Sequence, residues 1–94
     1  MENLKDVPEE VFEVFPNNSP KVKGVLLNKL KEGEWTEFYE NGKPRRIVNY
    51  HKGQKNGKTF VFKESGELDF CMEYKNGKLI ISPKFKKIVR SFSK

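Results

Sequence analysis

His51 and Cys71 are the only histidine and the only cysteine in the 94 residues, and they carry the most reactive side chains. A cysteine paired with a histidine can act as a nucleophile, and both residues can bind zinc. A metal site would need further ligands, but the sequence has no Cys-x-x-Cys pair and no second histidine. Gly57-Lys58-Thr59 resembles part of a phosphate-binding loop but lacks the upstream glycine that such a loop requires. We therefore expect no catalytic residue, no metal and no cofactor, and a protein that is not an enzyme.

Aromatic and basic side chains suggest a binding function instead. Aromatic residues beside arginine could stack on the bases of a single strand, although on a repeat sheet such residues more often form the core. The segment 82–94 adds a basic cluster without any acidic residue. The candidate partner-binding residues are Trp35, Tyr39, Arg45, Arg46, Tyr50, Lys84, Lys86, Lys87 and Arg90.

The stretch from Gly33 to Tyr50 predicts the β-hairpin that would position the first of these residues. Asn41-Gly42 favours a two-residue type I′ turn, because both residues tolerate a positive φ. This register pairs opposite charges and aromatic with aliphatic side chains. We expect the face with Trp35, Tyr39, Val48 and Tyr50 to be the more buried one. The other face would carry Thr36, Phe38, Arg45, Ile47 and Asn49.

The hairpin pattern recurs at an offset of 24 residues, which indicates a repeat protein. The identical pairs are Gly33/Gly57, Phe38/Phe62, Glu40/Glu64, Gly42/Gly66, Tyr50/Tyr74 and Gly53/Gly77. In the later copy, a two-residue turn at Ser65-Gly66 would place Glu64 opposite Glu67, so we expect a longer or different turn there. Asn76-Gly77 predicts a further turn, leading into an apolar strand at 79–81.

A degenerate earlier copy is expected at residues 9–32, with strands at 11–15 and 21–27. The rival interpretation of residues 8–15 is a short helix capped by Asp6. The full organisation is then a single domain, 1–94. Its segments are a frayed N-terminus (1–8), the degenerate repeat (9–32), two repeats (33–56 and 57–80) and a basic helical tail (82–94).

In residues 82–94 the spacing of apolar residues changes from that of a strand to that of a helix. Ser82-Pro83 is a helix start, and Phe85, Ile88, Val89 and Phe92 are spaced as one face of a helix. We expect a short amphipathic helix that caps the end of the sheet, since an unpaired edge invites association. The alternative is a basic helix that binds an anionic membrane or an acidic partner.

The pattern G-x-W-x-x-F-Y-x-N-G-K followed by Y-x-x-G resembles the MORN repeat in its bacterial variant form. The resemblance rests on Gly33, Trp35, Phe38, Tyr39, Asn41, Gly42, Lys43, Tyr50 and Gly53, and continues at Gly57, Phe62, Gly66, Tyr74, Asn76 and Gly77. It implies β-hairpins stacked into an elongated sheet, and protein–protein contact, scaffolding or membrane-lipid association. Some small bacterial members carry an antitoxin-like label. Thr59 and Lys63 depart from the pattern, where Trp35 and Tyr39 stand in the earlier copy.

Composition and charge set the remaining expectations. Aromatic residues make up 13% of the chain, which argues against disorder, and the net charge of +6 favours acidic partners. The N-terminus does not look like a signal peptide, a lone cysteine does not indicate an oxidising compartment, and no apolar run could span a membrane. We expect an all-β cytoplasmic protein that binds another protein, or itself through a sheet edge. Nucleic acid or anionic lipid is the alternative partner.

Overall fold

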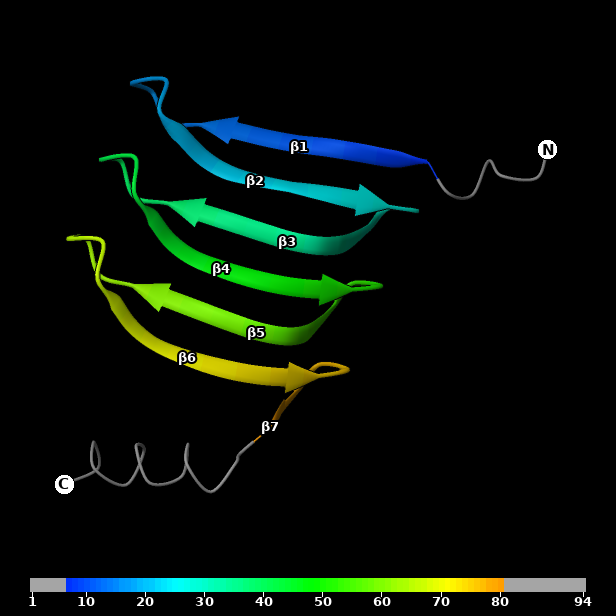
Figure 1. The fold of residues 1–94 in the computed structure, drawn as a ribbon. Coiled ribbons are helices and arrows are strands. Elements are labelled where there is room, and N and C mark those ends of the chain that lie inside the picture. Colours follow the sequence, from blue (N-terminus) through cyan, green and yellow to red (C-terminus); the bar gives the residue numbers. More distant parts are fainter. Residues whose placement is uncertain (1–6, 81–94) are drawn as a thin grey trace, which may run out of the picture.

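The computed structural model describes residues 7–80. They form one open antiparallel sheet in which the order of the seven strands is their order in the chain (Figure 1). The strands are β1 (Pro8–Val14), β2 (Pro20–Leu27), β3 (Leu30–Phe38), β4 (Pro44–His51), β5 (Gln54–Phe62), β6 (Leu68–Lys75) and β7 (Lys78–Ile80). The expected all-β meander is confirmed, whereas the expected C-terminal helix and residue 81 of the last strand lie outside the described residues.

The degenerate first repeat is a hairpin. β1 pairs with β2 from Pro8↔Leu27 onward, so residues 8–15 are not the short helix of the rival interpretation. The burial of successive side chains alternates as in a strand, since Val11 is partly buried while its neighbours Glu10 and Phe12 are exposed. The strand begins at Pro8, inside the segment 1–8 that we expected to fray, and residues 1–6 lie outside the described part of the chain.

Two kinds of connection alternate along the chain and give the sheet two different edges. Two-residue turns at 28–29, 52–53 and 76–77 have a positive φ at both positions and form what we call the tight-turn edge. Three-residue loops at 16–18, 40–42 and 64–66 form the wide-loop edge, on the left in Figure 1. Only their third residue has a positive φ, namely Asn18, Gly42 and Gly66.

The predicted type I′ turn at Asn41-Gly42 is therefore wrong in type. The amide of Gly42 donates to Tyr39 O at 3.0 Å, and the amide of Tyr39 donates to Lys43 O at 2.9 Å. A bulge between Glu37 and Phe38 then restores the predicted register, with Glu37 opposite Arg46. The longer turn expected at 64–67 is confirmed, because Lys63 N donates to Glu67 O at 2.8 Å.

The stretch between Tyr50 and Gly57 contains a tight turn and the start of a strand. His51 ends β4, Lys52-Gly53 forms the turn, and β5 already begins at Gln54. Each loop is tied to the next along the wide-loop edge, since Ser19 Oγ donates to Glu40 O and Asn41 Nδ2 donates to Glu64 O. Lys43 Nζ adds a bond to Ser65 O at 2.9 Å.

The core lies on the face that we expected to be the more buried one. Among the described residues, Trp35 and Val48 are the buried hydrophobic side chains, exposed by 7% and 3%, and Thr59 is exposed by 1%. All three come from the central strands β3, β4 and β5. A single-layer sheet leaves most other side chains partly or fully accessible, which makes both faces available for contact.

Candidate protein-binding surface

Trp35 lies over the backbone of the neighbouring strand rather than facing solvent. A Cβ at residue 24 would overlap the Trp35 ring, so only glycine fits beneath it. The indole Nε1–H donates to Val25 O at 3.0 Å. This candidate binding residue is thus built into the core, with its one polar group already bound.

Tyr50 and a lysine that we did not predict complete this cluster. The rings of Trp35 and Tyr50 meet edge to face, with centroids 6.5 Å apart. Lys31 Nζ lies 4.9 Å from the centroid of Trp35 and 5.0 Å from that of Tyr50. Lys55 repeats the contact over Tyr74 at 4.8 Å. The signal was present in the sequence, because Lys31 and Lys55 obey the 24-residue offset.

Tyr39, Arg45 and Arg46 come together nearer the wide-loop edge, where they line one hollow. Tyr39 donates its hydroxyl to Phe62 O at 2.7 Å, and the Arg45 guanidinium lies 5.7 Å from the centre of its ring. Arg45 was expected on the face of Phe38, but the bulge at Glu37 brings it to the Tyr39 side. Arg46 bonds Glu37 at 2.8 Å, and this hydrogen bond raises the pKa of Arg46 above its usual value.

His51 and Cys71 are not brought together. His51 Nδ1 contacts Glu32 Oε2 at 2.9 Å, and Glu32 Oε1 accepts the amide of Lys52 at the same distance. These hydrogen bonds, first that from the Lys52 amide and then that from His51, lower the pKa of Glu32. Cys71 instead pairs with Phe60 in the β5–β6 ladder. Within residues 7–80, no group of three or more metal-ligating side chains is assembled.

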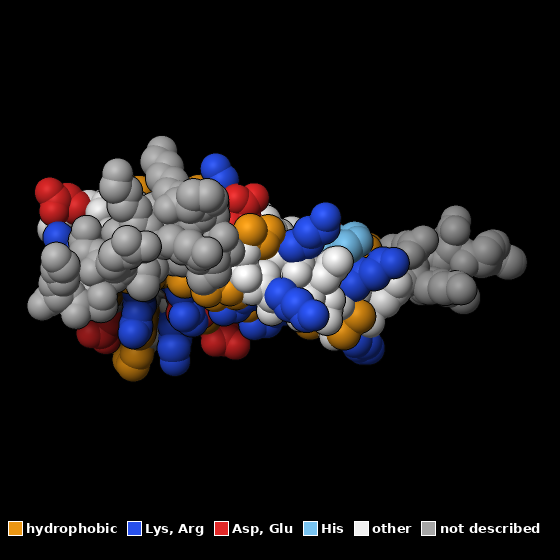
Figure 2. Space-filling view, turned by 90° about the horizontal axis from the view of Figure 1, so that it is seen from below, with side chains coloured by type: hydrophobic (Ala, Val, Ile, Leu, Met, Phe, Trp, Pro, Cys, Tyr) orange, Lys and Arg blue, Asp and Glu red, His pale blue; other side chains and the backbone are white. Residues whose placement is uncertain are grey.

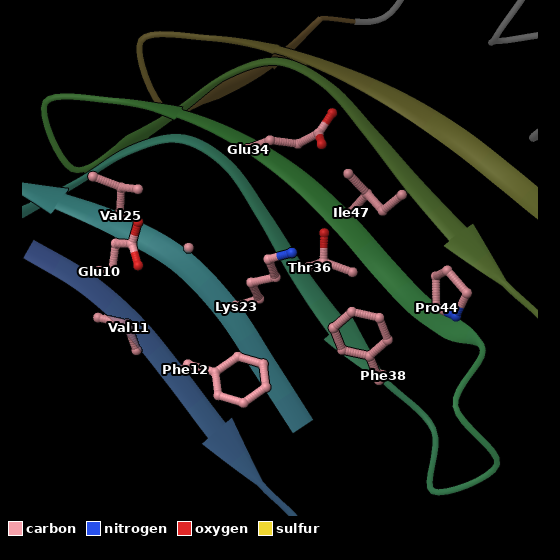
Figure 3. A pocket seen from close by; sticks show the side chains of 11 residues that line it. Glu10, Val11, Phe12, Lys23, Val25, Glu34, Thr36, Phe38, Pro44 and Ile47 are labelled. Carbon is pink, nitrogen blue, oxygen red and sulfur yellow. The ribbon is translucent and has the colours of Figure 1, made fainter. Parts of the chain in front are cut away.

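The opposite face carries a hollow of about 500 Å³ across β1–β4, which we did not predict as a site. Its apolar walls include Phe12, Phe38, Ile47 and Val25, whose side chains Figure 3 shows on four successive strands. Phe12 is 60% exposed, while the other three are partly buried. Glu10, Lys23 and Glu34 also line the hollow. We call this set the apolar hollow.

The missed residues had a weak signal in the sequence. Phe38 and Ile47 were placed on the correct face, but that face was not considered as a binding surface. Phe12 falls in the degenerate repeat, where the offset relates it to Thr36 and Phe60. Phe12 is a large aromatic residue in the first of these three copies. Its place in the first strand of the array was the one feature of the sequence that indicated a surface contact.

Charge is distributed unevenly between the two edges. Figure 2 shows basic side chains around the single histidine at the tight-turn edge, and a mixture of acidic and basic side chains toward the other end of the view. Lys29, Lys52, Lys75 and Lys78 belong to the tight turns or flank them. The remaining candidates, Lys84, Lys86, Lys87 and Arg90, lie outside the described residues. None of the described residues forms a helix long and apolar enough to cross a membrane.

The comparisons with known proteins concern the central hairpin. Residues 31–52 match the family model described as the MORN repeat variant. Searches of curated proteins and of solved structures returned no significant match. The matched segment runs from Lys31 in β3 to the tight turn after β4, and contains the Trp35–Tyr50 cluster. The predicted resemblance is confirmed for this segment: the chain carries a MORN repeat variant at residues 31–52.

Proposed function

We propose that this chain is a non-enzymatic protein-binding or scaffold module, whose partner occupies the apolar hollow. The observation that carries the proposal is the exposure of Phe12 in a hollow that Phe38, Val25 and Ile47 also line. A contiguous apolar surface with charged residues around it is a typical contact site for another protein. The match to a repeat family associated with binding supports the same class of function.

The side chains on the core face support the assignment indirectly. Trp35 Nε1 and the Tyr39 hydroxyl are already hydrogen-bonded within the sheet, and Lys31 covers the rings of Trp35 and Tyr50. A partner on that face would have to displace these contacts. The apolar hollow presents its side chains without such a rearrangement.

A photoactivatable phenylalanine analogue at position 12 tests the proposal in a native extract. We expect cross-links to a discrete protein, and loss of that protein from affinity capture by the full chain when Phe12→Asp is introduced. Leu30→Asp is the matched control, since Leu30 is 46% exposed but lies beside the first tight turn. Capture that survives Phe12→Asp, or that Leu30→Asp abolishes equally, would contradict the proposed surface.

Nucleic acid or an anionic membrane is the second candidate partner, favoured by the lysines of the tight-turn edge. Such binding releases counterions and falls steeply as salt rises. Titration with labelled RNA, labelled DNA and anionic vesicles at two salt concentrations tests it. Tight binding at low salt that weakens at high salt would support this candidate, and no binding at low salt would remove it.

A further inference from the structure

The side of β1 that faces away from β2 has no strand beside it in the described part of the chain. Figure 1 shows β1 as the outermost strand of the array, and all of Pro8–Val14 pairs with β2 on the other side. The one irregularity of this ladder leaves Lys21 of β2 without an opposite residue, so β1 itself stays regular. We call the outer side of β1 the β1 edge. Its free backbone groups can receive one more strand.

The charged residues of β1 are all acidic. Glu9, Glu10 and Glu13 are exposed, and the strand contains no lysine or arginine. Among the described residues, their one ion pair is a long one, with 4.0 Å between Glu9 Oε1 and the exposed Nζ of Lys29. Such a surface pair contributes little to stability. The carboxylates of β1 are therefore available to a basic partner.

The nearest lysines lie on the inner side of β1. Lys21 and Lys23 belong to β2, and Lys31 belongs to β3, where it covers the aromatic rings of the core face. A strand added at the β1 edge would lie about 4.8 Å from β1 and about twice as far from β2. The side chains directly opposite the added strand would be those of β1. These side chains set the charge that a partner strand meets.

Apolar side chains alternate with the carboxylates on both faces of β1. Phe12 lines the apolar hollow together with Glu10, and Val14 follows on the same face. Phe12 and Val14 are 60% and 45% exposed. Val11 lies on the core face, between the other two glutamates of the strand. Each face of the β1 edge thus offers a place for an apolar side chain beside places for basic ones.

A second copy of the chain fits the β1 edge poorly. Two β1 strands paired antiparallel about Val11 would place Glu9 opposite Glu13 twice, and like charges at opposite positions destabilise a ladder. At the other end of the array, the part of β6 that β7 leaves unpaired, 68–72, carries Asp69 and no basic residue. By contrast β2, the strand that β1 does pair with, has two lysines, several apolar residues and no acid.

We propose that the β1 edge receives an extended, basic segment of the partner protein as a further antiparallel strand. This inference rests on the proposed function, because the added strand borders the apolar hollow on the side of β1, and it names the chemistry of the partner. Opposite β1, taken from Val14 back to Glu9, the added residues are apolar, basic, apolar, apolar, basic and basic. The apolar residue opposite Phe12 extends the wall of the hollow, and the basic residues meet the three carboxylates.

Hydrogen exchange followed by nuclear magnetic resonance tests the strand addition on the full chain. The probe is the synthetic peptide acetyl-Ser-Val-Lys-Leu-Val-Lys-Lys-Ser-amide, whose six central residues follow this order. We expect the outward-facing amides of β1 to exchange freely in the chain alone and to become protected when the peptide binds. Methylation of the alternate peptide nitrogens that face β1 should abolish binding, whereas methylation of the other alternate set should leave it intact.

A charge-reversing variant separates strand addition from occupation of the apolar hollow. Glu13 lines the hollow on the core face beside Trp35, away from the apolar hollow. Glu13→Lys should therefore weaken peptide binding about fivefold by placing like charges opposite each other. The matched control is Glu73→Lys, which makes the same change at an exposed residue of β6 and should leave the affinity unchanged.

Several results would overturn the inference. They are β1 amides that are already protected in the dilute chain alone, and protection that appears only as the chain is concentrated, which would make a second copy the occupant. Equal loss of binding on methylation of either set of nitrogens, or equal binding by Glu13→Lys, would also overturn it.

The cross-linking experiment at position 12 separates this failure from that of the proposed function. If Phe12 cross-links to a discrete protein but the peptide leaves β1 unprotected, only the strand addition is rejected. If the peptide protects β1 but position 12 captures nothing, the strand addition stands and the partner in the apolar hollow is rejected.

Discussion

Two corresponding positions in successive repeats show how the array keeps its core. Gly24 lies beneath Trp35 where β2 meets β3, and 24 residues later Val48 lies opposite Thr59 where β4 meets β5. A very small residue faces a very large one in the first case, and two medium-sized residues face each other in the second. What the repeat preserves is the filling of the space between two strands, because interiors tolerate little empty or excess volume. Residue identity at either position can change if its partner changes with it.

The largest expected effect comes from breaking the first pair without compensation. Trp35→Thr, which installs the residue found at the same place in the next repeat, should lower the free energy of unfolding by about 3 kcal/mol. Urea denaturation followed by circular dichroism measures the loss. The double variant Gly24→Val/Trp35→Thr rebuilds the second pair and should recover at least ~1 kcal/mol of it. A double variant no more stable than Trp35→Thr alone would show that the Gly24–Trp35 and Val48–Thr59 pairs are not interchangeable.

Gly24→Val alone should have the next largest effect. The new side chain overlaps the Trp35 ring, so the ring must move and the free energy of unfolding should fall by about 2 kcal/mol. The fluorescence of Trp35, the only tryptophan, should shift to the red as the indole meets water. An unchanged emission maximum would mean that the ring does not close on Gly24.

Thr59→Val tests the second pair, Val48 and Thr59, and should stabilise the protein rather than destabilise it. Thr59 Oγ1 is buried and has no hydrogen-bond partner within the described residues. Replacing this hydroxyl with a methyl group of similar size removes an unpaired buried polar group, and should raise the free energy of unfolding by about 1 kcal/mol. Thr36→Val serves as control, because Thr36 is only half-buried. Destabilisation of Thr59→Val in urea would reveal a partner for the hydroxyl.

The smallest expected effect concerns the tight turns. Here, too, corresponding positions in two repeats carry different residues that do the same job, one with a carboxylate and the other with an amide. The side chain of Glu32 accepts the amide of Lys52, and 24 residues later Asn56 Oδ1 accepts the amide of Asn76 at 3.0 Å. Because the pKa of Glu32 is lowered in the folded state, its stabilising contribution is complete above the ordinary value of 4.5. It is lost as the pH falls through the lowered pKa.

Glu32→Asn should therefore reduce the loss of stability on acidification below about pH 4.5 while leaving the turn intact. Thermal unfolding at pH 3 and pH 7 measures this change for the variant and the unmodified chain. Glu34→Gln is the control, since Glu34 is exposed. If thermal stability falls equally on acidification with and without Glu32, the pKa of this carboxyl group is not lowered in the folded state.

The sequence predicted the strands and their register far better than it predicted the turns. Two pairs in the β3–β4 ladder were predicted correctly, namely Glu37 with Arg46 and Trp35 with Val48. Opposite charges and large apolar residues indicate such paired positions. Turn type escaped prediction because Asn41 bonds through its side chain, to the amide of Lys43 and to Glu64 O, and its own φ is not positive.

The candidate site was predicted only in part, for a related reason. Trp35 and Tyr50 were correctly placed on one face, where their rings meet. Only the three-dimensional contacts show that Trp35 and Tyr39 are hydrogen-bonded within the sheet. The exposure of Phe12 depends on its position in the first strand, where no further strand among the described residues covers it. Composition alone does not carry that information.

The match between strand order and chain order has a consequence for how such a protein can change in length. Every strand bonds only to the strands before and after it in the sequence. Duplication of a 24-residue unit in the gene would therefore insert one more hairpin without rethreading any existing one. The side-chain bonds between successive loops would join the new copy to its neighbours in the same way. Length is thus a property that evolution can adjust in steps of one hairpin.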